Sequence, residues 1–474
     1  MRSPALIRTL VEAQRRSADR WNTREVLLAP CVPQVPARRV LALAVPALGV
    51  LAAEPLYLLV DTAVVGRLGA VALAALAVGG VVLVQVATQL TFLSYGTTAR
   101  TARLYGSGQR AAAVVQGAQA TWLALGIGGV VLVVGQLAAG PVVRLIAGPG
   151  PVADAALGWL RIALFGAPFV LITLAGNGWM RGVQDTARPL RYILVGNGIS
   201  ALLCPVLVHG AGPVASLGLP GSAVANVVAQ VVAAGLFLRA LVAERATPRP
   251  SWETMRVQLG MGRDLVLRGL AFQACFLSAT VVAARTSAAA AGAHQVVLQL
   301  WFFLAMVLDA LAIAAQSLVG AALGAGNESS ARSLAWQITR YGLAFGTTLG
   351  LVFATAQPVL PQVFTSDSAV LAEVPHAWWF FVALQPVAGV VFALDGVLLG
   401  AGDAAFLRTC TLISALVGFL PVVWASFVCG WGLIGIWSGL AAFMVLRLAF
   451  VLARTYSPGW VVTGAVRGPG RIAP

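Results

Sequence analysis

Long apolar runs constrain this chain more than any other feature of its sequence. A helix that crosses a lipid bilayer needs about 20 mainly apolar residues, and the chain contains twelve runs of this kind. Lipid offers the backbone no hydrogen-bond partners, so each run must satisfy its own backbone as a helix. The sequence therefore predicts an all-α polytopic membrane protein. The runs are continuous rather than alternating, which excludes a transmembrane β-barrel.

The expected spans account for most of the 474 residues. Charged residues make up only 10% of the chain, whereas a soluble domain carries about 25%, so the charges are too few to cover water-facing domains. Arg, Gly and Pro residues bound the apolar runs and indicate twelve transmembrane helices. These lie at about residues 40–65, 72–97, 117–141, 155–179, 191–209, 219–242, 264–284, 290–317, 338–361, 375–399, 406–427 and 433–454.

Arginine is distributed unevenly over the connecting segments. All 31 basic residues are Arg, and the formal net charge is +15. If the N-terminus is cytoplasmic, the external segments hold only Arg67, Arg144 and Arg285, while Arg161 falls within a span. A cytoplasmic excess of Arg orients membrane proteins, which predicts a multi-pass protein of the bacterial plasma (inner) membrane with both termini in the cytoplasm. The same excess explains the basic charge without a nucleic-acid partner.

Several chemistries are excluded by residues that the chain lacks. No Lys is present, so neither a P-loop for ATP nor a Schiff base can form. The five Cys include no CxxC pair and the three His lie far apart, which argues against a disulfide framework and a zinc site. A membrane-embedded enzyme would need His/Asp or Ser/His clusters at helical spacing, and none occurs. We therefore expect a protein that is not an enzyme and that needs no metal or organic cofactor.

An internal repeat divides the chain at a constant offset of 218 residues. Six spans per repeat is an even number, so both halves enter the membrane in the same sense, and the axis that relates them lies along the membrane normal. This pattern predicts two pseudo-symmetric six-helix lobes, an arrangement typical of transporters. The residues that match at this offset are Thr62 and Thr280, Val64 and Val282, Arg67 and Arg285, Gly106 and Gly324, Gly108 and Gly326, Gly182 and Gly400, and Asp185 and Asp403.

The repeat also defines the expected domain boundaries. The first lobe covers residues 38–243 and the second covers 264–455, joined by a polar, basic cytoplasmic linker at 244–263. Cytoplasmic tails are expected at 1–37 and 456–474. The N-terminal tail mixes Arg with acidic residues and has no compact apolar core, so it differs from a cleaved signal peptide. Two readings of this tail stay open, a short amphipathic helix near residues 5–20 and a disordered or mis-started extension.

The first span carries two acids within its apolar run. An ionisable side chain at the bilayer centre costs about 2.5–3.5 kcal/mol on insertion scales, so a retained acid needs a reason. Glu54 and Asp61 are seven residues apart and share a helix face with Tyr57. Pro46 and Pro55 remove backbone hydrogen bonds and allow the helix to bend. This stripe is typical of a proton or cation relay, although hydrogen bonding between packed helices is the alternative.

Uncharged polar residues follow in the next spans. Asn177 lies near the end of the fourth span, and Asn197, Ser200 and Cys204 share one side of the fifth. Ser222 opens the sixth. Such groups bind a small cation or bridge to a carboxylate, but they also serve as interhelical hydrogen-bond partners, and the residues alone leave both readings open.

Two further acids lie in apolar runs of the second half. Asp309 is in the eighth span and Asp395 is in the tenth, both nearer the cytoplasmic ends of their helices. A structural and a functional role are equally open for both at this point.

Three segments resemble a known family. Residues 51–69 (Leu-Ala-Ala-Glu-Pro-Leu-Tyr-Leu-Leu-Val-Asp-Thr-Ala-Val-Val-Gly-Arg-Leu-Gly) are similar to the first-helix signature of multidrug and toxic compound extrusion (MATE) transporters. Residues 181–190 and 394–403 are similar to the DNA-damage-inducible F (DinF) branch of that family. The resemblance extends from about residue 38 to residue 455.

The resemblance implies two six-helix lobes in a V shape. It also implies multidrug efflux by antiport, in which cationic or amphiphilic compounds leave in exchange for H+ or Na+. The positions that correspond to the functional residues of the family are Asp61 for the first-helix carboxylate, Pro46 for the hinge, Asn177 in the fourth span, Ser200 and Cys204 in the fifth, and a hydroxyl at Ser222 in the sixth.

The chain departs from the family pattern where a second carboxylate is usual. Cys204 stands in that place, and Na+ prefers several hard oxygen ligands. Gln273 and Ala388 lie near the positions where the sodium-driven branch has further carboxylates. The sequence therefore favours H+ over Na+ as the coupling ion, carried by Asp61 alone or by Asp61 together with Glu54.

The expected partners follow from this reading. They are small amphiphilic or cationic substrates and membrane lipid, with no nucleic acid, and the protein is expected to act as a monomer. The alternative function is a flippase for lipid-linked saccharides, whose families share the two-lobe plan. A flippase would need several Arg to hold a pyrophosphate, and Arg161 alone does not supply them.

Overall fold

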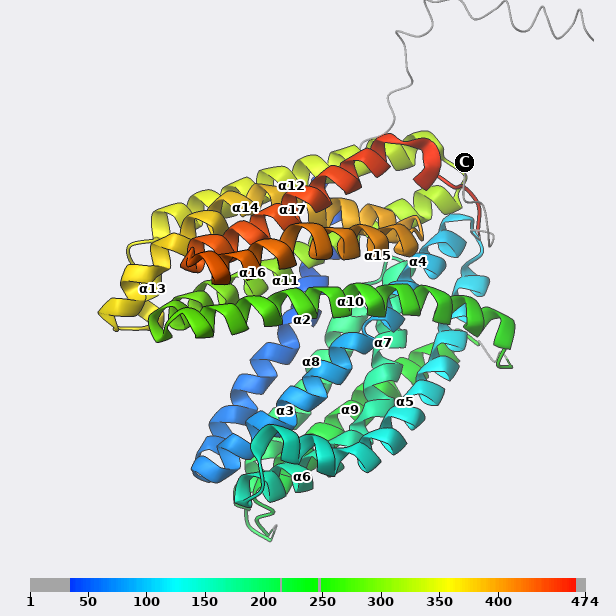
Figure 1. Ribbon diagram of the computed structural model, residues 1–474. Helices are drawn as coiled ribbons and strands as arrows, with labels where there is room; N and C mark the ends of the chain where they lie inside the picture. The colour runs from blue at the N-terminus through cyan, green and yellow to red at the C-terminus, as the bar shows by residue number, and fades with distance from the viewer. Residues whose placement is uncertain (1–34, 214, 246–248, 466–474) are drawn as a thin grey trace, which may run out of the picture.

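The computed structural model describes residues 35–213, 215–245 and 249–465. Its described elements are long α-helices arranged in two groups that meet at one end and diverge at the other (Figure 1). The expected N-terminal tail and its amphipathic helix near residues 5–20 lie outside the described residues, apart from the last positions before α2. The all-α fold predicted from the apolar runs is confirmed.

The first group contains the helices before residue 245. They are α2 (Ala37–Gly66), α3 (Ala70–Leu90), α4 (Phe92–Gly106), α5 (Arg110–Ala147), α6 (Pro151–Ala163), α7 (Ala167–Gly182), α8 (Ala187–His209) and α9 (Leu219–Ala243). The second group lies above it in Figure 1. Its helices are α10 (Trp252–Thr286), α11 (Ala288–Gly324), α12 (Glu328–Ala356), α13 (Leu360–Phe364), α14 (Ser368–Gly400), α15 (Ala404–Ile413), α16 (Leu420–Cys429) and α17 (Gly432–Tyr456).

Eleven helical stretches of the described chain are long and apolar enough to cross a membrane. Several expected spans consist of two helices in line: α3 with α4, α6 with α7, and α15 with α16. The ninth expected span is α12, whose sequence is too polar to reach that level because Arg332 and Arg340 lie in its first half. It nevertheless runs along α14 for much of its length and belongs to the same layer (Figure 1).

The connection between the two groups is shorter than the sequence indicated. The linker was expected to extend from residue 244 to 263, but α10 already begins at Trp252. The first turns of α10 are amphipathic and rest on the first group, where Met255 and Leu259 pack against its apolar core. Gln258 is buried and donates a hydrogen bond to the Thr97 hydroxyl at 2.6 Å. These contacts let the helix start before it reaches the membrane-spanning run.

The two groups meet where α4 crosses α11, and we call this the junction end. A Cβ atom on Gly106 would overlap the carbonyl of Ala321, and a Cβ atom on Gly324 would overlap the carbonyl of Arg103. Gly106 therefore contacts Ala321, and Gly324 contacts Arg103. Gly106 and Gly324 correspond to one another at the 218-residue offset, and so do Arg103 and Ala321. Such reciprocity is what a two-fold relation between halves produces. The opposite end, on the side of α6 and α13, is the diverging end (Figure 1).

The C-terminal segment after α17 also reaches the junction end. Trp460 is fully buried and donates from its indole nitrogen to the carbonyl of Thr455 at 2.9 Å. Arg103 of α4 donates to the carbonyls of Val462 and Ala401, both at 2.8 Å. The two groups are therefore joined there by backbone contacts of the chain's end as well as by helix packing.

Candidate functional site

Asp61 lies in a buried polar cluster of the first group. It is only 2% exposed, on the face of α2 that packs against α8. The thiol of Cys204, from α8, donates a hydrogen bond to Oδ1 of Asp61 at 3.2 Å. The hydroxyl of Ser222, from the first turn of α9, also interacts with the carboxyl group. Three helices thus place Asp61, Cys204 and Ser222 together.

Ser222 is itself oriented by a residue from a fourth element. The indole Nε1 of Trp159, in α6, donates a hydrogen bond to the Ser222 hydroxyl oxygen at 3.1 Å. Because that oxygen accepts from the indole, its own hydrogen is left to point at Asp61. Trp159 was missed in the sequence, where it is one of 13 Trp with no distinguishing spacing.

Tyr57 and Ser200 extend the cluster by one helical turn. Both are buried, and both hydroxyl oxygens have no hydrogen-bond partner in the described part of the chain. The Tyr57 hydroxyl faces Ser200 and Asn226. Asn226 was also missed, although its spacing of one turn after Ser222 on α9 was visible. Buried hydroxyls without partners cost about 1–3 kcal/mol each, so this place is suited to a water molecule or a hydrated proton.

Three other predicted residues lie outside this cluster. Glu54 is exposed and makes no hydrogen bond or ion pair with any described residue. Asn197 donates from Nδ2 to the carbonyl of Ala53 at 3.0 Å, so it fastens α8 to α2 instead of facing Asp61. Asn177 is buried in α7 with its Oδ1 unpaired, and no described contact links it to Asp61.

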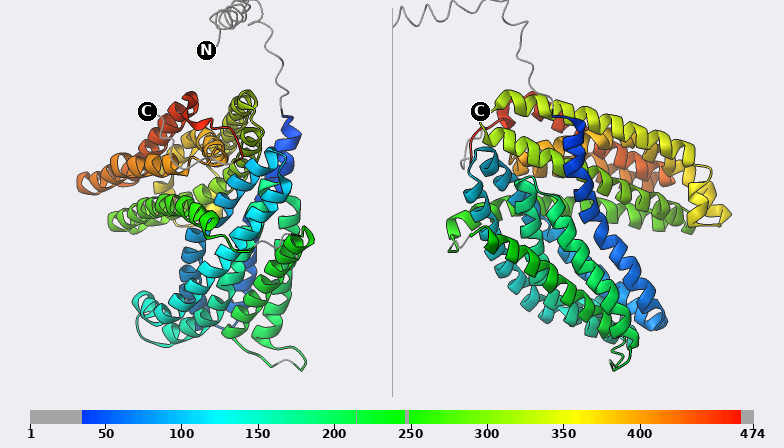
Figure 2. Two further views of the ribbon diagram at one scale, coloured as in Figure 1. Left: turned by 90° about the vertical axis from the view of Figure 1, so that its right-hand side faces the viewer. Right: turned by 180° about the vertical axis from the view of Figure 1, so that it is seen from behind.

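Pro46 lies near the start of α2, away from Asp61. Because proline has no backbone N–H, the carbonyl of Ala42 lacks the helical hydrogen bond that residue 46 would otherwise donate. The hydroxyl of Thr186, from the segment between α7 and α8, reaches this carbonyl at 3.5 Å. The ribbon of α2 changes direction in its upper part (Figure 2). The proline is therefore located where the helix can bend while its freed carbonyl retains a partner.

The acids of the second group have different surroundings. Asp395 is buried and forms ion pairs with Arg268 at 2.6 Å and with Arg447. Arg447 in turn lies over the ring of Phe272. This compact set joins α10, α14 and α17.

The places where the sodium-driven branch has further carboxylates hold no acid. Gln273 donates to Gln85 Oε1 at 2.9 Å, and Ala388 is 1% exposed within the apolar core of the second group. Among the residues that the structure describes, no group of three or more His, Cys, Asp or Glu side chains could hold a metal ion.

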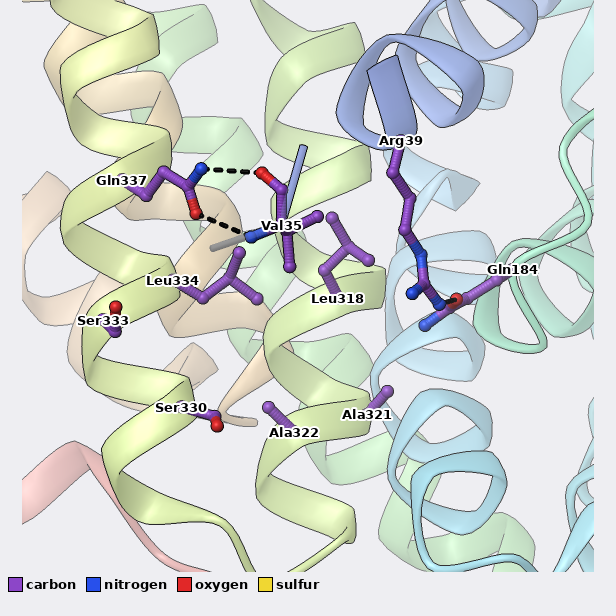
Figure 3. Close-up of a pocket in the computed structure, with 10 residues that line it drawn as sticks. All are labelled: Val35, Arg39, Gln184, Leu318, Ala321, Ala322, Ser330, Ser333, Leu334 and Gln337. Atoms are coloured by element: carbon purple, nitrogen blue, oxygen red, sulfur yellow. Dashed lines mark hydrogen bonds between the residues drawn. The ribbon is translucent and has the colours of Figure 1, made fainter. Parts of the chain in front are cut away.

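A separate pocket opens near the start of α2 (Figure 3). It has a volume of about 200 Å³ and lies between α2, α11 and α12. Arg39 borders it and donates to the side-chain oxygen of Gln184 at 2.8 Å, while Gln337 is held by the backbone of Val35. No acid lines this pocket. Since Arg39 is 22 residues before Asp61 on α2, the pocket is distinct from the Asp61 cluster.

A polytopic helical bundle of two related halves, with buried carboxylates between its helices, is typical of the class of membrane transporters. The model of the MatE family matches residues 46–206 and 265–424 of the chain. The chain belongs to the MATE family of multidrug efflux transporters.

Individual relatives agree with this assignment. The chain is 32% identical to "Protein DETOXIFICATION 44, chloroplastic" of Arabidopsis thaliana over 86% of its own length and 80% of that protein. It is 28% identical to "DNA damage-inducible protein F" of Escherichia coli, and the match covers 83% of this chain and 86% of that protein. Its fold matches a crystal structure of a MATE protein in the bent conformation with a TM-score of 0.81 at 20% identity, over 88% of this chain and 94% of that one.

Proposed function

We propose that the protein exports cationic or amphiphilic compounds in exchange for protons, and that Asp61 carries the proton. The observation that supports this proposal most is the hydrogen bond from the Cys204 thiol to Asp61. A thiol donates weakly and is a soft ligand, so it stabilises a carboxylate without completing an oxygen cage. With Ser222 as the neighbouring hydroxyl, the cluster favours H+ over Na+.

The surroundings of Asp61 allow its charge to control packing. Apolar surroundings favour a neutral carboxyl group over a charged one. When Asp61 is ionised, it attracts Cys204 and Ser222 and holds α2 against α8 and α9. When it takes up a proton from the external side, this attraction weakens and α2 bends at Pro46. The space that remains for the exported compound then shrinks, and loss of the proton to the cytoplasm resets the site.

Glu54 has a supporting role in this proposal. It is exposed, it lies two turns before Asp61 on α2, and it has no counter-ion in the described chain. An unpaired carboxylate in this position attracts cations, and it provides a second site for a proton on its way to or from Asp61. Neither role requires a metal or an organic cofactor.

The orientation in the membrane is part of the proposal. With both termini in the cytoplasm, the junction end faces the cytoplasm and the diverging end faces outward, because Arg residues concentrate in the segments at the junction end. The conformation described here would then be the one that receives protons from outside.

Transport into proteoliposomes tests the function. The purified protein is reconstituted, and uptake of a fluorescent lipophilic cation is followed with a pH gradient alone and with a Na+ gradient alone. We expect the pH gradient to drive uptake and the Na+ gradient to have no effect. Uptake driven by Na+ alone would contradict the assignment of the coupling ion.

A further inference from the structure

A hydrogen bond to an acid crosses between the two groups of helices. The hydroxyl of Tyr95, in α4, donates to Oδ2 of Asp309, in α11, at 2.5 Å. Both side chains are partly buried. Around this bond, Gln316 Nε2 donates to the carbonyl of Tyr95 at 2.8 Å, and the Ser317 hydroxyl donates to the carbonyl of Arg181 at 2.6 Å. Tyr95 and Asp309 thus lie among the contacts that hold the two groups together.

The charges near Asp309 come from both groups. Arg181, in α7 of the first group, and Arg268, in α10 of the second, act on the carboxyl group, with an opposing contribution from Asp395. Arg268 and Asp395 already pair with one another. The guanidinium of Arg181 makes no side-chain hydrogen bond in the described chain, and its buried Nε has no partner. Of the described acids, Asp309 is the one whose charge acts on Arg181, after the larger influence of Tyr95, and no ion pair within 4 Å joins the two side chains.

Two further contacts between the groups at the junction end do not change with a proton. Arg103 donates to backbone carbonyls, and a guanidinium remains charged at any pH that a protein experiences. Gly106 and Gly324 contribute close packing only. Asp309 is thus the group in this set whose charge a proton can remove.

We propose that Tyr95 and Asp309 form a proton-sensitive latch between the two lobes. When Asp309 is ionised, it accepts the Tyr95 hydrogen bond and attracts Arg181, which keeps the junction end closed. When Asp309 binds a proton from the surrounding water, the attraction to Arg181 is lost and the junction end opens more readily. The proton returns to water when the latch closes again.

Asp309 is a positioning residue in this proposal, because it acts on the contact between the lobes and not on the substrate. The proposal rests on the proposed function, in which protons drive the cycle. It adds a second place where the proton acts: Asp61 alters the packing of α2 within one lobe, and Asp309 alters the contact between lobes. The two effects can be separated, because the contact between the lobes is measured as a distance across the junction end, whereas the effect of Asp61 is measured as transport.

The test measures opening of the junction end without transport. Gln109 and Ala325 are exposed on opposite sides of the junction, and each is replaced by a spin-labelled Cys. Cys31→Ser and Cys429→Ser remove the other cysteines that must not be labelled, while the buried Cys204, Cys275 and Cys410 are retained. The distance between the two labels is recorded by pulsed electron paramagnetic resonance in nanodiscs at alkaline and at acidic pH.

We expect acid to raise the open-to-closed ratio of the otherwise unchanged protein by about tenfold, which corresponds to about 1.4 kcal/mol. Asp309→Asn, which keeps an acceptor for Tyr95, should give the open-rich distribution at both pH values. Tyr95→Phe should raise the open fraction at alkaline pH and keep part of the response. Asp154→Asn, an exposed acid in α6 at the diverging end, is the matched control and should respond as the parent does.

A full pH response in Asp309→Asn would overturn the latch. A Tyr95→Phe variant whose distance distribution equals that of the parent at both pH values would also overturn the latch. This second variant keeps the proposal testable if Asp309→Asn does not fold. If the distances respond as expected but a pH gradient drives no transport, the latch stands and the proposed function is wrong.

Discussion

The thiol of Cys204 donates a hydrogen bond to the carboxylate of Asp61 across the interface of α8 and α2, at 3.2 Å. The MATE family usually has a carboxylate at the position of Cys204, as the sequence resemblance implies. A pair of carboxylates attracts a metal cation, whereas a thiol beside one carboxylate leaves a site for a single proton. This relationship therefore supports H+ as the coupling ion. It also supports a coupling site in the first lobe that carries one carboxylate charge instead of two.

Replacing Cys204 by Asp tests this reasoning directly. Cys204→Asp supplies two hard oxygens next to Asp61, and we expect transport to become stimulated by Na+. Cys204→Ser is the control, because it keeps a small donor without adding charge, and its transport should remain independent of Na+. Initial rates in proteoliposomes with and without a Na+ gradient provide the measurement. Equal Na+ independence of both variants would show that Cys204 does not determine ion selectivity.

The hydroxyl of Ser222 should matter for the same site. Ser222→Ala removes a donor to Asp61 and leaves the buried indole N–H of Trp159 without its acceptor. Loss of such a hydrogen bond costs about 1–3 kcal/mol, so we expect a lower melting temperature and slower proton-driven export. Ser222→Thr retains the hydroxyl and should restore much of both properties. If Ser222→Ala matched the parent in stability and transport rate, the hydrogen bonds from Trp159 to Ser222 and from Ser222 to Asp61 would not contribute to function.

The crossing of α4 and α11 makes a prediction about glycine. A Cβ atom at Gly106 or Gly324 would overlap the backbone of the opposite helix, which cannot move aside as a side chain does. Gly106→Ala and Gly324→Ala should therefore each destabilise the closed junction by about 1–3 kcal/mol. Gly80→Ala, where no atom lies within 4 Å of the new Cβ, serves as the control. Thermal unfolding in detergent should show lower midpoints for the first two variants and no loss for the third.

Membrane orientation is tested by labelling. A Cys at position 250, which is exposed between the lobes, should react only with reagents that reach the cytoplasm. A Cys at position 211, which is exposed in the segment between α8 and α9, should react in intact cells with an impermeant maleimide. The opposite pattern at these two positions would invert the topology and the direction of the proposed cycle.

Features that depend on periodicity and repetition were predictable from the sequence. Apolar runs predict the helices because lipid leaves the backbone no alternative. The offset that pairs Gly106 with Gly324 predicts two related lobes, and both glycines indeed lie at the crossing of α4 and α11. The approach of Cys204 and Ser222 to Asp61 followed from the family resemblance, not from spacing within single helices.

Contacts that depend on how separate helices rotate and slide against each other were not predictable. Asn197 shares a helix with Cys204 yet faces the backbone of α2. The pairing of Tyr95 with Asp309 depends on how the two lobes meet, and no spacing within one helix encodes that. The π-helical turn at Ser414–Phe419, just before Pro421, also lacked a periodic signal, since a proline that withdraws a donor only permits such a turn.

The most direct test of the account is proton-driven export by Asp61→Asn. Asn resembles the protonated carboxyl in shape but cannot release a proton, so the variant should insert and fold yet lose gradient-driven transport. Uptake of a fluorescent lipophilic cation into proteoliposomes under a pH gradient should fall to the protein-free level. Asp154→Asn, the exposed acid in α6 at the diverging end, is measured in parallel and should retain the parent rate. Transport by Asp61→Asn at the parent rate would contradict the account and would make Glu54 the next candidate for the coupling residue.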